Sequence, residues 1–162
     1  MNRFLALRLA LCGSAALAGC VTTAAGGGDP EPHFSSLYAN YLSGCAQCHA
    51  PGAVGATSTT EKSLDFSTQA AAYASLSGKA NGLIGNQAGC DGVAFIVKDK
   101  PASSLLVATL DASTRNAFDL PGNPNCDNNA ISDMTLPKLG KAPSAAFLTA
   151  LKTWVQNGAL ND

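Results

Sequence analysis

Two stretches of the chain carry apolar side chains at helical spacing, and polar or glycine-rich sequence separates them. In the first stretch the apolar side chains recur at intervals of three and four residues until Gly44 ends the pattern. Its apolar members are Leu37, Tyr38, Tyr41 and Leu42. The pattern predicts a short helix over residues 33–44.

The second stretch lies near the C-terminus and has the more regular stripe. Ser144 supplies an N-cap in front of it, and Gly158 suits the position just after its end. The stripe consists of Phe147, Leu148, Leu151, Trp154 and Val155. We predict a helix over residues 144–157, with Trp154 packed in the core rather than acting as an electron relay.

Two weaker helical signals lie between these stretches. Ser67 or Thr68 can cap a helix that ends near Leu76. Pro101 opens a second helical segment that runs to about Leu110. The remaining segments, predicted as loops or as short extended chain, are residues 53–62, 82–92, 94–97 and 119–133.

Residues 1–19 are typical of a bacterial export signal. Arg3 and Arg8 give a positive start, and the apolar run over residues 9–18 is too short for a transmembrane helix. The segment ends in Leu-Ala-Gly-Cys at Cys20, which resembles the lipobox of bacterial lipoproteins. The resemblance implies cleavage before Cys20 and a diacylglycerol on its sulfur. An ordinary signal peptide cut nearby is the alternative.

This resemblance implies a membrane anchor and a simple domain organisation. Residues 20–32 are rich in Gly, Pro and small side chains and predict a flexible tether. Residues 33–162 remain as one folded domain. We expect a lipid-anchored protein of the cell envelope that faces the periplasm or the surface. Val21 after the lipidated position favours the outer membrane, by resemblance to enterobacterial sorting.

Charge narrows the possible partners. The whole chain has a formal net charge of −1, which gives no basic footprint for nucleic acid. Once Arg3 and Arg8 are removed with the signal, 8 basic and 11 acidic side chains remain, so the exported chain carries a formal −3. Charge complementarity therefore favours a partner protein with a basic surface.

The chain has six cysteines, and four of them are left in the exported part beyond the lipid site. Cys12 lies in the apolar part of the signal and Cys20 is the predicted lipid site. Cys90 and Cys126 form one pair that no other motif uses. Export places this pair in an oxidising compartment, so we predict a disulfide between Cys90 and Cys126.

The other two cysteines belong to a short motif. Cys45, Cys48 and His49 read Cys-Ala-Gln-Cys-His, the spacing of covalent c-type haem attachment. On a helical turn, thiols three residues apart lie on one side and can add to the two haem vinyl groups. The motif predicts one covalent haem c, held through thioethers at Cys45 and Cys48, with His49 as the proximal iron ligand.

A zinc site and a redox dithiol are the other uses of such a motif. Zinc takes about four ligands, whereas His33 is the one other His and the remaining cysteines are distant in sequence. A thioredoxin-like dithiol expects a βαβ pattern, which this sequence does not show. Both alternatives are therefore less favoured than haem.

With these residues in view, the chain resembles the small bacterial cytochromes c of class I type. The resemblance implies an all-α fold with long loops around one haem. It also implies that a helix over residues 34–44 leads into the haem motif, and that the C-terminal helix packs across this first helix. A Cys pair that brackets the region before the Met is a feature of exported relatives, and Cys90 and Cys126 bracket it here.

Met134 is the candidate for the second axial ligand. It is the one Met that remains after signal removal, and it lies in a polar loop rather than in an apolar stripe. By the resemblance, Met134 is the distal iron ligand, and a thioether there raises the potential of the iron. The sequence departs from its relatives because residues 135–136 separate Met134 from Pro137. The alternatives are an open or water-bound position, His33, Lys138 and Lys141.

These features predict a membrane-anchored electron carrier that exchanges single electrons with redox partner proteins. Haem peroxidases need a distal His or Arg near an open iron, and the exported chain has two His and one Arg, Arg115. A haem sensor or peroxidase-like enzyme with an open or labile sixth position is the alternative. A structural lipoprotein with an accidental motif is a third hypothesis.

Overall fold

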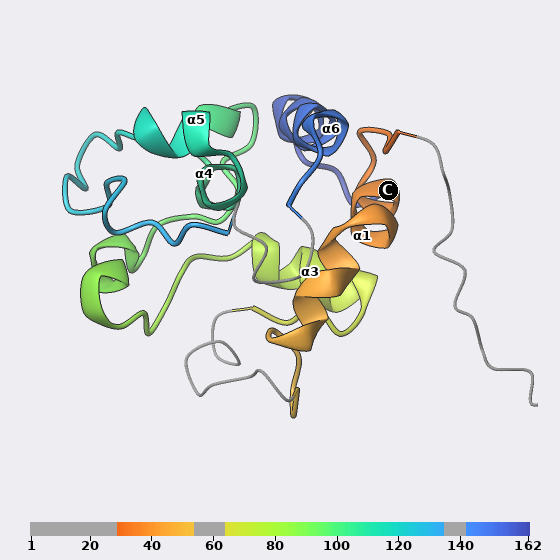
Figure 1. Ribbon diagram of the computed structural model, residues 1–162, viewed down its shortest axis with the longest axis horizontal. Helices are drawn as coiled ribbons and strands as arrows, with labels where there is room; N and C mark the ends of the chain where they lie inside the picture. Colours follow the sequence, from red (N-terminus) through yellow and green to blue (C-terminus); the bar gives the residue numbers. More distant parts are fainter. Residues whose placement is uncertain (1–28, 54–63, 135–141) are drawn as a thin grey trace, which may run out of the picture.

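The computed structural model describes residues 29–53, 64–134 and 142–162, which form a mostly helical domain (Figure 1). No β-strand occurs within these ranges, and the one β-bridge there joins Lys79 to Ala94. The described part is therefore all-α. The signal, Cys20, Val21 and most of the predicted tether lie outside it. None of the helices in the described ranges is long and apolar enough to cross a membrane.

The first predicted helix is split in two. Helix α1 spans Phe34–Asn40, and a 3-10 turn, η1, follows over Leu42–Gln47. The break falls at Tyr41, whose backbone angles (φ −148°, ψ −53°) leave the helical region. The ring of Tyr41 packs on Phe147 with centroids 4.5 Å apart. Helical spacing alone does not reveal such a change of direction, because the apolar positions continue through it.

Helix α3 confirms the helix predicted to start after Ser67 or Thr68 and to end near Leu76. It spans Gln69–Leu76, and the hydroxyl of Thr68 accepts a hydrogen bond from the amide of Ala71. This N-cap satisfies one of the amides that the first turn leaves without a helical partner. A predicted loop contains one further 3-10 turn, η2, over Gly85–Cys90.

The segment predicted as one helix from Pro101 to about Leu110 becomes two elements, and a further short helix follows it. A 3-10 turn, η3 (Pro101–Ser103), precedes α4 (Leu105–Leu110), and α5 (Ala112–Asn116) follows without a loop. The buried hydroxyl of Ser104 accepts from the amide of Val97 at 2.8 Å, and this bond holds the junction between η3 and α4. Sequence reasoning missed α5, because a five-residue helix has no apolar period to read.

Helix α6 spans Ala145–Gln156 and confirms the C-terminal prediction at both ends. The hydroxyl of Ser144 accepts from the amide of Phe147 at 3.1 Å. Gly158 has a φ of +90°, a conformation that glycine adopts at little cost after a helix end. The helix therefore begins and ends where its capping residues place it.

An aromatic cluster joins α1, α3 and α6. The ring of Phe34 lies 5.2 Å from Tyr73 and 5.3 Å from Trp154, measured between centroids. Trp154 is 2% exposed, as its core assignment predicts, and its indole N–H donates to the carbonyl of Leu160 at 2.8 Å. Helix α1 lies beside both α3 and α6 (Figure 1).

Asp111 ties α5 to α6. Its carboxylate caps α5 and also forms an ion pair with Lys152 on α6. Burial is the largest single effect and raises the pKa of this carboxyl, while the hydrogen bond and the charge of Lys152 lower it. With further hydrogen bonds from Thr114 and Ser113, the net result is a pKa of Asp111 well below its usual 3.8.

Asp111→Asn should therefore lower stability in a pH-dependent way. A carboxyl with a depressed folded-state pKa stabilises the fold above its ordinary pKa and stops doing so as pH falls through the folded value. We expect the variant to lose about 1 to 3 kcal/mol at pH 7. The difference from wild type should shrink below about pH 4. Urea unfolding at several pH values measures this, with the exposed Asp119→Asn as the charge-matched control. A pH-independent difference would contradict the assignment.

Candidate functional site

The Cys-Ala-Gln-Cys-His motif lies at the end of α1, within and just after the turn η1. The amides of Cys48 and His49 both donate to the carbonyl of Cys45, at 3.1 and 2.8 Å. Two hydrogen bonds to one acceptor close a tight turn, so the backbones of Cys45, Cys48 and His49 share one turn, although their side chains do not converge as a three-ligand metal site. A short apolar helix fixed in the core immediately precedes this turn.

The two motif cysteines are not bonded to each other. Both are free thiols, with Cys45 buried at 9% exposure and Cys48 half-buried. Burial raises the pKa of the Cys45 thiol to about 11. A redox dithiol works through a thiolate whose pKa is lowered. The environment of Cys45 therefore opposes the redox-dithiol interpretation.

Phe66 contacts both the backbone and the ring of His49. The amide of Phe66 donates to the carbonyl of His49 at 2.6 Å. The two rings meet edge to face with centroids 6.0 Å apart. The hydroxyl of Tyr38 on α1 donates to the carbonyl of Phe66 at 2.9 Å. Phe66 is 1% exposed, so His49 is held between its own turn and a buried residue that sequence reasoning did not single out.

Met134 comes from a different part of the chain. Its side chain is half-buried against the core, and its amide donates to the carbonyl of Thr109, the last residue but one of α4, at 3.0 Å. The rival ligands Lys138 and Lys141 lie outside the described residues. Tertiary contact with α4, rather than a local motif, therefore fixes the backbone at Met134.

His33, the other rival ligand, has a partner of its own. Its Nδ1 lies 2.7 Å from a carboxylate oxygen of Asp162, and this hydrogen bond raises the pKa of His33 above its usual 6.5. Asp162 also accepts from the amide of Phe34, so the pair lies at the start of α1, whereas the motif follows its end.

The donors of this turn can be compared with what a haem would need from the protein. In the described residues, no group of three or more His, Cys, Asp or Glu side chains comes together to hold a metal. A haem iron takes four ligands from the macrocycle and needs only axial side chains from the protein. Two unbridged thiols and an imidazole in one turn, with a half-buried thioether elsewhere, fit that requirement.

Cys90 and Cys126 are brought together, with their sulfur atoms 2.03 Å apart. The two loops approach so closely that a Cβ on Gly89 would lie 2.2 Å from the carbonyl oxygen of Asn125. Only glycine fits there. The sequence gives no signal of this contact, because Gly89 and Asn125 are far apart along the chain.

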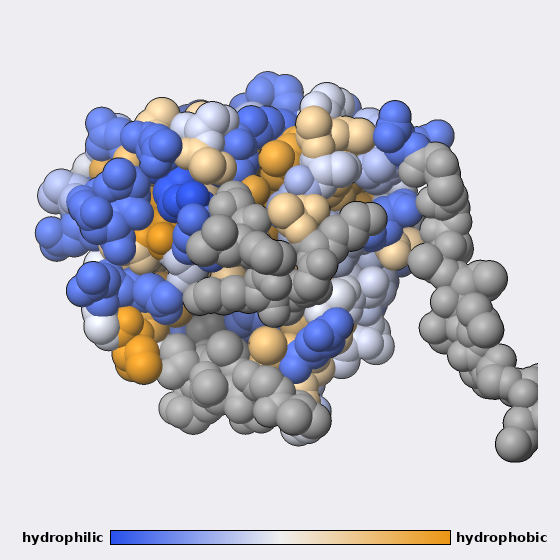
Figure 2. All heavy atoms as spheres, in the orientation of Figure 1, coloured by the Kyte–Doolittle hydropathy of each residue, from blue (hydrophilic) through white to orange (hydrophobic). Residues whose placement is uncertain are grey.

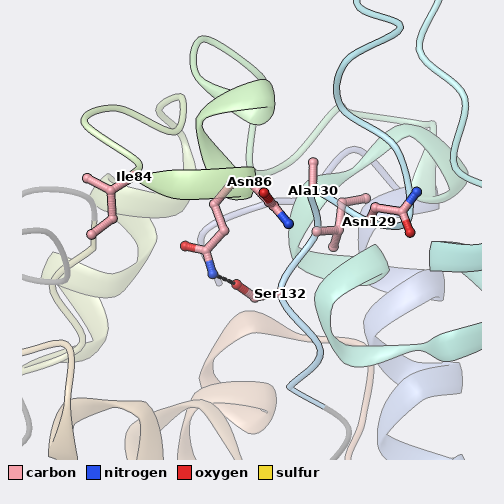
Figure 3. Close-up of a pocket in the computed structure, with 7 residues that line it drawn as sticks. Ile84, Asn86, Asn129, Ala130 and Ser132 are labelled. Carbon is pink, nitrogen blue, oxygen red and sulfur yellow. Dashed lines mark hydrogen bonds between the residues drawn. The ribbon is translucent and has the colours of Figure 1, made fainter.

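A cavity of about 460 Å³ lies beside this junction (Figure 3). Its lining is uncharged, and two of the lining residues are joined by a hydrogen bond, which the side-chain amide of Gln87 donates to the hydroxyl of Ser132. None of the predicted haem-binding residues lines it. Its lining residues are Ile84, Asn86, Gln87, Asn129, Ala130, Ile131 and Ser132.

Comparisons with protein-family models, with curated proteins and with solved structures find no match for the chain. The chemistry of the motif and of its surroundings must therefore carry the functional assignment.

Joint replacement of the paired cysteines, Cys90→Ala with Cys126→Ala, should destabilise the domain. Their separation of 36 residues in sequence corresponds to about 3 to 4 kcal/mol of loop-closure free energy. Urea unfolding measures the loss. Dithiothreitol should bring wild type down to the level of the double variant and leave the variant unchanged. If dithiothreitol leaves the urea unfolding curve of wild type unchanged although both thiols are shown to be reduced, the disulfide does not stabilise the domain.

Proposed function

We propose that this protein is a membrane-anchored monohaem c-type cytochrome that transfers single electrons in the periplasm or at the cell envelope. The observation that carries the proposal is the turn in which Cys45, Cys48 and His49 lie together, with both thiols unbridged. The export signal and lipobox-like sequence that precede it add an envelope location and an anchor at Cys20.

Each residue has a stated role in this proposal. Cys45 and Cys48 would hold one haem c through thioethers, His49 would be the proximal iron ligand, and Met134 the distal one. The haem supplies an iron that gains and loses one electron reversibly. His49 is oriented by two backbone hydrogen bonds and by the buried ring of Phe66. Contacts of this kind orient a ligand side chain and would tune the group that it binds.

Surrounding side chains favour an electron carrier over the sensor or peroxidase-like alternative. A peroxidase would require a free distal base or guanidinium. Arg115 is 7% exposed and is already paired with Asp133 at 3.1 Å. The rival base His33 is engaged by Asp162. The formal charge of −3 on the exported chain favours basic redox partner proteins.

Optical spectra of the purified protein test the proposal. After expression with haem-attachment machinery, wild type should be red, with sharp reduced c-type bands and the weak far-red band of Met–iron ligation. Cys45→Ala with Cys48→Ala should abolish the covalent haem in the mass spectrum, because no thioether remains. The exposed Gln47→Ala, inside the same motif, is the matched control and should keep it.

Met134→Ala separates the carrier from the alternatives. Loss of the thioether should turn the ferric iron high-spin and let the ferrous protein bind carbon monoxide, which wild type should resist. A wild-type ferrous spectrum that shifts under carbon monoxide would replace the carrier by the sensor or peroxidase-like function. A colourless wild type would favour the third hypothesis, in which the protein is a structural lipoprotein and the motif is accidental.

Cys20→Ser tests the anchor separately. Cells fed labelled palmitate should incorporate the label into wild type but not into the variant, because only the thiol accepts the diacylglycerol. Cys48→Ser is the matched control and should still be labelled. Equal labelling of wild type and Cys20→Ser would show that the lipid is not on Cys20.

A further inference from the structure

A buried arginine lies behind the segment that carries Met134. Arg115 is the one Arg in the exported chain, and it is 7% exposed. Burial of a cation is costly unless hydrogen bonds and an opposite charge compensate for it. An ordinary core position would hold an apolar side chain instead. The contacts of Arg115 therefore indicate what this cation does.

The guanidinium bridges two elements. On one side, Nη1 donates to the carbonyls of Ala108 and Thr109, at 3.4 and 3.5 Å. These carbonyls lie at the C-terminal end of α4, where helical partners are lacking and a cation is favourable. On the other side, Nη2 lies 3.1 Å from a carboxylate oxygen of Asp133. The planar guanidinium of an Arg can donate hydrogen bonds on both sides at once, which the ammonium group of a Lys does less well.

Met134 is attached to the same place. Its amide donates to the carbonyl of Thr109 at 3.0 Å, the carbonyl that Arg115 also contacts. Asp133 and Met134 are neighbours in sequence, so both are tied to the end of α4. Further back, Ser132 accepts from Gln87 and Cys126 is paired with Cys90. Residues 126–134, which we call the Met134 segment, are thus held at successive points along their length.

We propose that Arg115 is the positioning residue for Met134: its guanidinium fixes Asp133 and the end of α4, and this would hold the Met134 thioether in place for a haem iron. The inference rests on the proposed function, since it needs a haem with Met134 as axial ligand. Arg115 touches neither the haem nor the ligand sulfur in this proposal. It acts through the backbone of the Met134 segment. Its loss should therefore change the ligation equilibrium of the iron, in addition to any change in folding stability.

The experiment compares four purified holoproteins below their unfolding temperatures: wild type, Arg115→Met, Asp133→Asn and Val155→Ala. Arg115→Met keeps the length of the side chain but removes its charge and hydrogen bonds. Asp133→Asn removes one partner at a position whose side chain is 42% exposed, so it should fold even if Arg115→Met does not. Val155→Ala destabilises the core at a fully buried position of α6, and Val155 makes none of the hydrogen bonds that hold the Met134 segment as described above.

The readouts are the far-red Met–iron band, the midpoint potential and the concentration of imidazole that displaces the methionine. We expect Arg115→Met to lose the band and to show a lower potential, because a thioether ligand raises it. Asp133→Asn should keep the band. Imidazole should displace its methionine at about one fifth of the concentration that wild type requires, which is the effect of one partly exposed ion pair. Val155→Ala should melt earlier with band, potential and imidazole response unchanged.

The outcomes separate this inference from the proposed function. A wild type without haem, or without the Met–iron band, overturns both. A wild type with the band whose Arg115→Met and Asp133→Asn variants keep wild-type potential and imidazole response overturns the positioning role alone. If Arg115→Met does not fold, Asp133→Asn decides. An equal change in Val155→Ala would also overturn the inference, because general destabilisation would then be sufficient.

Discussion

The packing of Trp154 against Phe34 is the contact on which the rest of the molecule depends. It joins the last helix to the first, and Tyr73 brings α3 to the same place. Helix α1 has seven residues and is too short to be stable alone. Its position is set by these rings and by Tyr41 against Phe147. Because the haem-type motif follows α1 directly, the aromatic cluster also determines where that motif lies.

Capping residues decided how much of the fold could be predicted. Helix α6 has Ser144 and Gly158 at its ends and an apolar stripe between them, and α3 has Thr68, so local sequence specifies both. The break at Tyr41 and the short helix α5 depend on tertiary contacts, the first on Phe147 and the second on Asp111 with Lys152. Apolar periodicity carries no information about such contacts, so one continuous helix through Tyr41 was predicted wrongly and α5 was not predicted.

The candidate site shows the same division between local and distant information. The grouping of Cys45, Cys48 and His49 follows from their spacing, since one turn contains all three. Phe66 contacts His49 from elsewhere in the chain through a backbone hydrogen bond and a ring edge, and Arg115 holds Asp133, the neighbour of Met134, through an ion pair. A buried Phe and a single Arg are ordinary in a sequence. Their importance becomes visible only when the structure shows which backbone groups they contact.

Helix α1 also determines a distance. At about 1.5 Å per residue, its seven residues place the motif roughly 10 Å along the helix axis from the point where the preceding segment enters the domain. For a carrier tethered at Cys20, the flexible tether would enter the domain at one end of α1, and the motif would lie beyond the other end. The number of residues between lipid and helix would then set how far from the bilayer an electron can be delivered. Lengthening or shortening that spacer would select among partners by their height above the membrane, with no change to the domain itself.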